Sequence, residues 1–288
     1  MSDPLPDTLE KLACGSLIQH GPASDRIYLM KAAPDFPAHL PDDLIALARA
    51  RGYSKIFAKV AEPQAAVFLA KGFETEANVP GFYSGRDTAL FMGFYLNPTR
   101  RQEAERTRIE DILQIALAKN PLVNLSPLDP RFVVQDCEPV DVTAMARIYR
   151  EVFPSYPFPI HDPDYLLKTM QSHIAYFGVK ADDEWVAISS AEMDVSASNV
   201  EMTDFATPPR WRGNHLAQHL LARMELEMKA RQIQTAYTIA RAMSAGMNVT
   251  FRKAGYALGG RLKNNTQISG RIESMNIWYR SLVEAELR

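Results

Sequence analysis

The sequence has little cysteine and no long apolar run, and each absence excludes a class of protein. Cys14 and Cys137 are the only cysteines among the 288 residues, so we expect a reducing compartment and no disulfide framework. No stretch approaches the ~20 apolar residues of a membrane-spanning helix. The first residues also lack the basic start and apolar run of a signal peptide. We therefore expect a cytoplasmic protein that makes no use of a membrane.

The charges of the chain are nearly balanced. Lys and Arg number 32 against 34 Asp and Glu, and no run of basic residues stands out. A nucleic-acid partner usually requires a basic patch, so none is expected. Apolar residues make up 47% of the chain, which is ample for a buried core, and 288 residues are more than one core usually holds. We therefore expect two domains.

Short apolar runs alternate with helical patterns along the whole chain, which is typical of an α/β protein. The Pro-rich segment 121–130, PLVNLSPLDP, is expected to be a linker between a first domain at 1–120 and a second at 131–288. The expected strands are residues 26–30, 55–60, 77–83, 88–95, 131–136, 174–180, 184–194, 200–207, 235–239, 257–263 and 273–279. The expected helices are residues 42–51, 63–71, 100–119 (a charged connector), 141–153, 164–170, 212–231 and 246–253.

The two halves resemble each other in the order of these elements. SKIFAKV leads to a helix ending FLAKGFE and then to two strands, and TAYTIAR leads to a helix ending FRKAGYA and again to two strands. A strand followed by a helix with a Gly-aromatic ending is a common unit, so coincidence is one interpretation. We favour the other, a tandem of two related domains of which the first lacks the long helix after its central strand.

The segment EMTDFATPPRWRGNHLAQHLLARM, residues 201–224, has the most informative pattern in the chain. A strand ends at a Pro-Pro pair, a turn with Arg and Gly follows, and a long helix begins at once. The first N–H groups of a helix lack intrahelical acceptors and lie at the positive end of its dipole, so they bind anions such as a pyrophosphate. Arg212 adds positive charge, and Gly213 allows close backbone approach. An ordinary strand–helix turn with a surface arginine is the competing interpretation.

This segment resembles the acetyl-CoA-binding motif of GNAT acetyltransferases: Arg or Gln, two residues, Gly, one residue, then Gly or Ala. Arg212 begins the motif, Ala217 ends it, and His215 replaces the usual central glycine. The resemblance implies acetyl-CoA as co-substrate and a mixed, mostly antiparallel sheet flanked by helices, in the class α/β (α+β), preceded by a smaller α/β domain. The residues implied in binding acetyl-CoA are Phe205, Thr207, Arg212, Gly213, Asn214, His215, Leu216, Ala217 and Asn248.

More narrowly, the chain resembles the β-lysine acetyltransferases, which make the compatible solute Nε-acetyl-β-lysine used in osmoadaptation. This implies acetyl transfer from acetyl-CoA to the ε-amino group of β-lysine. Two alternatives stay open: a GNAT enzyme for another amine, such as a polyamine, an aminoglycoside or a protein lysine, and a non-catalytic acyl-CoA-binding module. The segments that resemble the family are SLIQHGPASDRIYLMK, GYSKIFAKV, PGFYSG, SYPFPIHDPDYL, AEMDVSASNVEMTDFAT, TAYTIARAMSAGMNVTFRKAGYALGGRL and ESMNIWY.

Carboxylates on the central strand are candidates for the catalytic base. An amine attacks a thioester only as the free base, and an alkylammonium with a pKa near ~10.4 is mostly protonated at neutral pH. Help from a positioned base is worth roughly 10²–10⁴-fold. Strand alternation places Glu201 and Asp204 on opposite faces, so at most one should face a given pocket. We prefer Glu201 as base or ammonium anchor and Asp204 as the second candidate; an ion pair at the sheet surface is the alternative for either.

Other side chains are candidates for the substrate site. β-Lysine has two ammonium groups and one carboxylate, so Glu192 is expected to bind a cation and Arg241 the carboxylate, with Glu273 as a weaker candidate. Tyr156, in the Pro-rich loop SYPFPIHDP, is either a packing residue or part of a lid over the substrate. A homodimer is an open alternative for the assembly.

Many GNAT enzymes have a tyrosine that protonates the leaving thiolate, and the resemblance places Phe251 at that position. Phe251 cannot donate a proton, so Tyr237, Tyr256 or water are the alternatives. His215 and His219 have the spacing of a two-histidine metal site, but no third ligand accompanies them, and no metal is expected.

Overall fold

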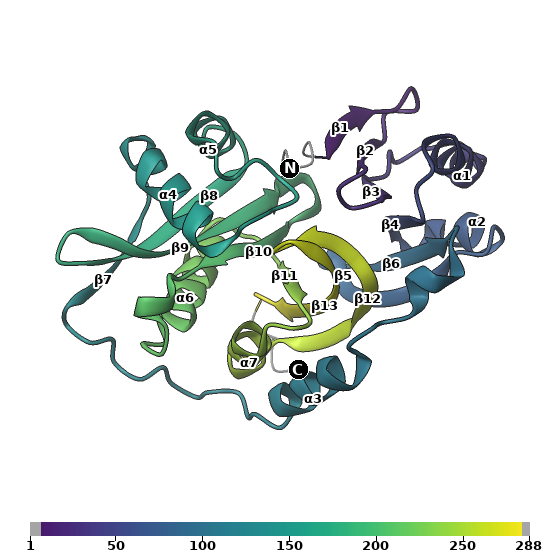
Figure 1. Cartoon of the computed structure of the whole chain (residues 1–288). Coiled ribbons are helices and arrows are strands. Elements are labelled where there is room, and N and C mark those ends of the chain that lie inside the picture. Colours follow the sequence, from purple (N-terminus) through teal and green to yellow (C-terminus); the bar gives the residue numbers. More distant parts are fainter. Residues whose placement is uncertain (1–6, 284–288) are drawn as a thin grey trace.

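The structure, a computed structural model, describes residues 7–283, and strands from both halves of the chain join in one continuous sheet (Figure 1). The strands are β1 (Thr8–Lys11), β2 (Leu17–Gly21), β3 (Arg26–Lys31), β4 (Lys55–Ala61), β5 (Glu74–Tyr83), β6 (Asp87–Tyr95), β7 (Phe132–Asp136), β8 (Ile174–Ala181), β9 (Glu184–Asp194), β10 (Asn199–Ala206), β11 (Thr235–Arg241), β12 (Ala257–Ile268) and β13 (Arg271–Ser281). The helices are α1 (Leu40–Arg51), α2 (Ala66–Leu69), α3 (Arg106–Leu117), α4 (Val142–Val152), α5 (Pro163–Met170), α6 (Leu216–Ala230) and α7 (Ala245–Lys253).

The sheet order is β1-β2-β3-β4-β6-β5-β12-β13-β11-β10-β9-β8-β7. Within residues 7–283, the pairs β3–β4 and β10–β11 are parallel and the other neighbours are antiparallel. The predicted mixed, mostly antiparallel sheet flanked by helices is therefore confirmed. Among the helices of the described chain, none combines the length and apolarity needed to cross a bilayer.

Most strand predictions agree with the structure to within a few residues, but β1 and β2 were missed. β1 is a fully exposed edge strand with the sequence TLEK, so it has no apolar alternation to reveal it. The helix expected at 63–71 is also shorter, because a 3₁₀ turn at Glu62–Gln64 precedes the brief α2. α6 begins at Leu216 instead of residue 212, which leaves the Arg-Gly turn as loop.

The elements of the two halves follow each other in the same order. β3 is followed by α1, the parallel strand β4, α2 and the hairpin β5–β6, while β10 is followed by α6, the parallel strand β11, α7 and the hairpin β12–β13. The sheet order is mirrored about the contact between β5 and β12. A helix therefore does follow the central strand of the first half, and the prediction that this half lacks one was wrong. The Pro-rich loop 32–39 separates β3 from α1 and obscured their relation.

Aromatic side chains from both halves form one core where the halves meet. Phe57, Phe82 and Phe91 of the first half pack with Tyr237 and Ile277 of the second, and each is at most 4% exposed. Burial of a large apolar side chain contributes about 1.5–3 kcal/mol. The first half is therefore part of the support of the central strand β11, since Tyr237 lies on that strand.

Close backbone packing at two glycines joins the halves. Gly260 on β12 pairs with Ala77 on β5. A Cβ on Gly260 would lie 2.3 Å from the carbonyl oxygen of Glu76, and its φ is +144°. At the neighbouring Gly259 a Cβ would lie 2.4 Å from the carbonyl oxygen of Asn78. The two hairpins can approach this closely only because neither position has a side chain.

We expect Gly260→Ala to lower the free energy of unfolding by about 1–3 kcal/mol, because the added methyl group overpacks the seam and strains the backbone. Urea unfolding measures this loss. Gly270→Ala is the matched control: its φ is +85°, but a Cβ there meets nothing within 4 Å, so only the backbone strain of about 1 kcal/mol applies. Equal losses in the two variants would contradict close packing at the seam.

Candidate active site

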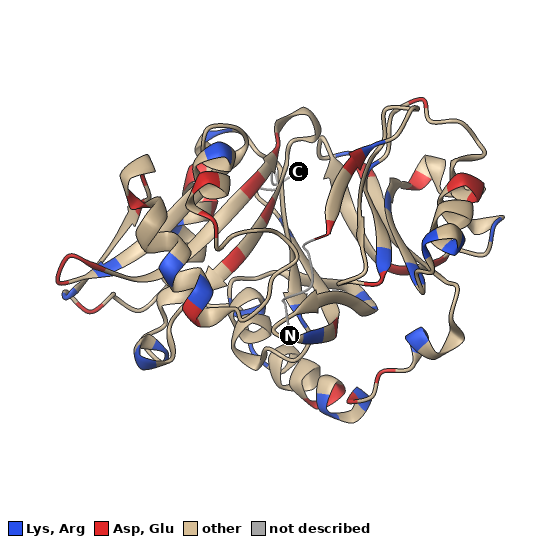
Figure 2. Ribbon diagram, turned by 45° about the horizontal axis from the view of Figure 1, so that its top comes forward, with Lys and Arg blue, Asp and Glu red and all other residues tan. Residues whose placement is uncertain are grey.

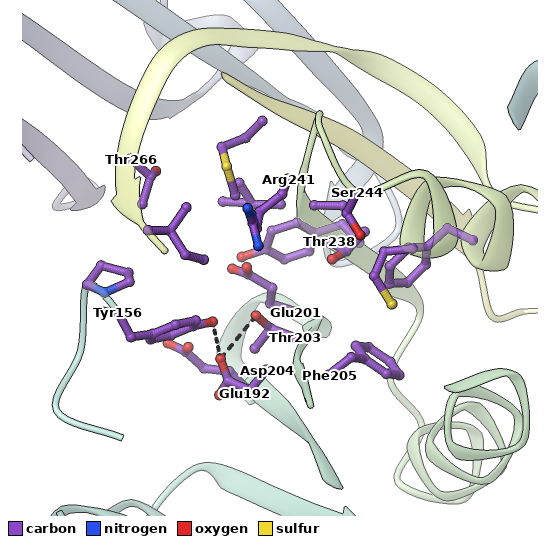
Figure 3. A pocket seen from close by; sticks show the side chains of 18 of the residues that line it. Tyr156, Glu192, Glu201, Thr203, Asp204, Phe205, Thr238, Arg241, Ser244 and Thr266 are labelled. Carbon is purple, nitrogen blue, oxygen red and sulfur yellow. Dashed lines mark hydrogen bonds between the residues drawn. The ribbon is translucent and has the colours of Figure 1, made fainter. Parts of the chain in front are cut away.

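A cavity opens where two parallel strands separate. The ladder between β10 and β11 runs from Asn199 to Glu201 on one strand and from Thr235 to Tyr237 on the other, and then stops. β10 continues along β9 and β11 along β13, so their facing backbone edges have no strand partner beyond this point. A cavity of about 1060 Å³ lies at this opening and is lined by residues of both halves (Figure 3).

A bulge on β10 brings both candidate carboxylates to the cavity. The register between β10 and β9 shifts between Thr203 and Ala206, and Asp204 has a φ of +55°. A bulge inserts a residue into the ladder and interrupts the alternation of side chains. Glu201 and Asp204 therefore both line the cavity. The prediction that at most one of them faces the pocket was wrong, because it assumed an unbroken strand.

Glu201 lies beside a hydroxyl and an amine that come from different halves of the chain. The Tyr237 hydroxyl lies near its carboxylate and lowers the pKa of Glu201, and Lys59 Nζ donates a hydrogen bond to the Tyr237 oxygen at 3.3 Å. Burial, and then the charge of Glu192, raise the pKa of Glu201 to about 8, and the charge of Lys59 opposes this rise. A carboxylate with such a pKa can accept a proton at neutral to mildly alkaline pH, as a general base must.

Asp204 is held by several hydroxyl groups. It accepts hydrogen bonds from Tyr156, from Ser190 at 2.5 Å and from Thr203 at 3.4 Å. Burial raises the pKa of Asp204, while the hydrogen bonds from Ser190 and Tyr156 lower it. Tyr156, from the Pro-rich loop, reaches into the cavity through this contact (Figure 3). Since its oxygens are already bonded, Asp204 is better placed to orient Tyr156 than to accept a proton.

The other predicted substrate residues divide into two groups. Glu192 lines the cavity and pairs with His173 at 3.7 Å. Arg241 also lines it, but two of its nitrogens donate to the Glu273 carboxylate at 2.9 and 2.7 Å. Glu273 also pairs with Arg271 at 3.0 Å and is not among the residues that line the cavity. Glu273 therefore neutralises Arg241 from outside the cavity lining, and its contact with the substrate stays a prediction.

The turn before α6 has the features of an anion site. Gly213 has a φ of +87° with open space where a Cβ would lie, and His215 at the N-cap has a φ of +58° with no side-chain cap. Within the described chain, the N–H groups of residues 213–217 have no hydrogen-bond acceptor. Arg212 is exposed beside them and its Nε donates to the carbonyl of Thr207. These free donors at a helix start fit a pyrophosphate.

Most residues implied in acetyl-CoA binding line the cavity, but two asparagines do not. Asn214 is held by Arg131 and the carbonyl of Trp211. Asn248 is fully buried, and its amide donates to the carbonyls of Arg241 and Ser244. Asn248 therefore fixes the start of α7, and its contact with the pantetheine arm stays a prediction. Those that do line the cavity are Phe205, Thr207, Arg212, Gly213, His215, Leu216 and Ala217.

The first half supplies cavity residues that the sequence analysis missed. Arg26 and Tyr28 on β3 and Lys59 on β4 line the cavity. The internal repeat could have indicated these residues from the sequence. If the halves correspond, β3 and β4 match β10 and β11, whose side chains form the site.

Two tyrosines were considered as proton donors to the thiolate, and one of them lines the cavity. Burial, and then Glu201, raise the pKa of Tyr237 well above its ordinary value, so its hydroxyl stays protonated. Tyr256 is fully buried and does not line the cavity. Phe251 packs edge-on against Phe205 and Tyr256 in the core.

An anion-binding helix start, two splayed parallel strands and a carboxylate with a raised pKa define a class: a transferase that moves an acyl group from a CoA thioester to an amine. The residues that line the cavity suit this co-substrate. Among residues 7–283 there is no group of three or more His, Cys, Asp or Glu that could hold a metal ion.

Comparison with known proteins identifies the family. The family model described as Acetyltransferase (GNAT) family matches residues 142–253. The chain is 37% identical to a β-lysine N(6)-acetyltransferase of Methanococcus maripaludis, with 92% of this chain and 96% of that protein covered. It is 39% identical to the enzyme of the same name from Methanosarcina mazei (73% and 85% covered) and 30% identical to N-acetyltransferase YodP of Bacillus subtilis (93% and 96%).

The chain therefore belongs to the GNAT acetyltransferases and, within them, to the family of the β-lysine N(6)-acetyltransferases. It is an acetyl-CoA-dependent N-acetyltransferase whose acceptor is a small amine. Both resemblances found in the sequence are confirmed.

We expect Ala217→Trp to raise the dissociation constant for acetyl-CoA at least about tenfold, because the indole would fill the space beside the first helical N–H groups. Isothermal titration with acetyl-CoA measures it. His215→Gly is the control, with unchanged or tighter binding, because glycine adopts a positive φ without strain. Unchanged affinity in a folded Ala217→Trp protein would place the co-substrate elsewhere.

We expect activity to rise with pH through about 8, since Glu201 accepts a proton only after losing its own and its folded-state pKa is raised. Glu201→Gln should lower kcat by roughly 10²–10⁴-fold, with little change in the KM for acetyl-CoA, and remove this limb of the pH profile. Asp204→Asn is the comparison and should retain the limb. A damaging Asp204→Asn beside a silent Glu201→Gln would exchange the two assignments.

Proposed function

We propose that this protein transfers the acetyl group of acetyl-CoA to the ε-amino group of β-lysine, giving the compatible solute Nε-acetyl-β-lysine. The names of two relatives at 37% and 39% identity support this substrate. The observation that carries the proposal is a cluster of three carboxylates, Glu192, Glu201 and Asp204, in one cavity beside the anion-binding start of α6. Figure 2 shows several Asp and Glu residues, in red, along the central strands of the second half, next to the first half.

Charge matching favours a diamine. The negative charge of Glu192 raises the pKa of both Glu201 and Asp204, and a cation placed among the three carboxylates relieves this repulsion. β-Lysine carries two ammonium groups, and its reacting amine belongs at Glu201, where the strands separate. Glu192, whose only ion-pair partner in the described chain is the half-exposed His173, is the proposed anchor for the second ammonium.

Glu201 starts the proposed reaction by accepting a proton from the ε-ammonium. The free amine attacks the thioester carbonyl, a C–N bond forms and the C–S bond breaks. The CoA thiolate takes up a proton, and the attacking nitrogen, which is cationic once the C–N bond has formed, loses its second proton to the group that donated to the thiolate. Tyr237, protonated and in contact with Glu201, is the proposed donor to the thiolate, and Lys59 beside its oxygen stabilises the tyrosinate that results. The unpaired edge of β10 at Phe205 and Thr207 is the proposed partner of the pantetheine arm.

We propose that residues 1–120 are a degenerate GNAT-like domain with a connector helix, 121–130 a linker and 131–288 the catalytic domain. The matching element order supports this division. The first copy lacks an anion site because α1 begins with Leu40 and Pro41, without an Arg-Gly turn before it. Its role is to wall the substrate cavity with side chains of β3 and β4.

Two further parts of the proposal concern the cell and the assembly. The free cysteines Cys14 and Cys137 support a reducing compartment, the cytoplasm.

A homodimer is the proposed assembly, with the open edge strand β7 and its exposed Val133 as the contact. Light scattering measures the mass in solution.

CoA release with a panel of amines tests the function. We expect kcat/KM for β-lysine to exceed that for spermidine, an aminoglycoside and a lysine-containing peptide by at least about 100-fold, and mass spectrometry should locate the acetyl group on the ε-nitrogen. A higher value for spermidine would make the protein a polyamine acetyltransferase. Release of CoA with none of these amines, despite acetyl-CoA binding, would overturn the proposed substrate.

A further inference from the structure

A buried arginine of the first half lies at the wall of the cavity and plays no part in the mechanism above. Arg26 begins β3, is 3% exposed and lines the cavity. Its Nη1 donates to the carbonyl of Asn265 at 2.6 Å and to Thr266 Oγ1 at 2.9 Å. The guanidinium carbon lies 5.3 Å from the centre of the Tyr28 ring. Arg26 is thus a fixed cation inside the molecule.

Arg26 has no carboxylate within ion-pair distance in the described chain. Its neighbour Arg100 makes the same kind of contact with β12, to the carbonyl of Asn264 at 2.8 Å, but also pairs with Asp25 at 2.9 Å. Arg26 forms no ion pair with any residue of 7–283, and its Nε has no hydrogen-bond partner. Burial lowers the pKa of Arg26 to about 10, while the more distant Asp7 raises it.

An unpaired buried cation is costly unless an anion binds to it. The guanidinium group presents parallel N–H donors that match a carboxylate. Next to it, Asn265 is 1% exposed, lines the cavity and has an unpartnered Oδ1. That oxygen suits an ammonium group adjacent to the carboxylate. Arg241, the other arginine of the cavity with a candidate role, is already bonded twice to Glu273.

We propose that Arg26, with Thr266 and Asn265, binds the carboxylate end of an amino-acid substrate, and so selects amino acids over polyamines. The inference rests on the proposed function, because it takes the acceptor to be β-lysine. In Figure 3 Thr266, which contacts Arg26, lies on the side of Glu201 opposite to Phe205, where the co-substrate is placed. The substrate therefore spans the two halves, its carboxylate on the first and its reacting amine at Glu201 on the second.

The test compares each amino acid with the amine that lacks its carboxylate: β-lysine with 1,4-diaminopentane, lysine with 1,5-diaminopentane and ornithine with 1,4-diaminobutane. We expect the wild-type protein to favour β-lysine over 1,4-diaminopentane by at least about 100-fold in kcat/KM. The Arg26→Gln variant should have a kcat/KM for β-lysine about 100-fold lower than the wild type, mainly through a higher KM. Its kcat/KM for 1,4-diaminopentane should fall by less than about threefold. Titration calorimetry with β-lysine in the presence of CoA should show the same loss of affinity.

Arg100→Gln is the matched control, because it removes a buried arginine that contacts the same strand but does not line the cavity. Any effect of this variant should be equal for the two members of a pair. Arg26→Lys retains the charge without the paired donors, so its kcat/KM for β-lysine should lie between those of the wild type and Arg26→Gln. This variant provides the test if Arg26→Gln does not fold.

Three outcomes would overturn the inference: equal losses on both members of a pair in Arg26→Gln, a wild-type preference for the diamines, or full β-lysine activity in both Arg26 variants. Failure of the proposed function is a separate result. If β-lysine is no substrate but lysine or ornithine is, the same comparison within that pair still decides the role of Arg26.

Discussion

The site depends on one constraint of backbone geometry, the early separation of the parallel strands β10 and β11. Their ladder ends at Glu201 and Tyr237, and the bulge beyond Thr203 turns Asp204 toward the space that opens. The same divergence leaves backbone edges free for an extended acyl chain and leads directly to the anion-binding start of α6. The end of this pairing therefore brings Glu201, Asp204 and the turn before α6 to one cavity.

The first half of the chain completes this opening. It extends the sheet through the close contact of β5 with β12 and shares an aromatic core with Tyr237. It also places Lys59 against Tyr237. A half that follows the element order of the second half thus provides one wall of the cavity. This explains why the similarity to β-lysine N(6)-acetyltransferases extends over both halves and not only over residues 142–253.

The electrostatics of the cavity follow from burial. Glu201 has a raised pKa because water is scarce around it and Glu192 lies near, while Lys59 limits the rise. In the proposed reaction a cationic amine is attracted to this site and then gives up a proton to Glu201. Arg241 contributes little net charge because Glu273 binds it from behind, so Arg26 is the buried guanidinium of the wall without an ion-pair partner among the described residues, while the exposed Arg212 lies at the turn before α6.

The sequence by itself determined the elements with strong periodicity and the family, and it predicted the turn 212–217 as the place of the co-substrate. Glu201 could be predicted as the candidate base from the sequence, because a carboxylate on a central strand is a feature of the local sequence. The bulge at Asp204 could not be foreseen, because it depends on pairing with β9 and not on the residues of β10 alone. The burial of Asn248, the neutralisation of Arg241 and the arrival of Arg26 and Lys59 also required the tertiary structure. They join residues far apart in the chain, and spacing along a sequence contains no information on which distant side chains meet.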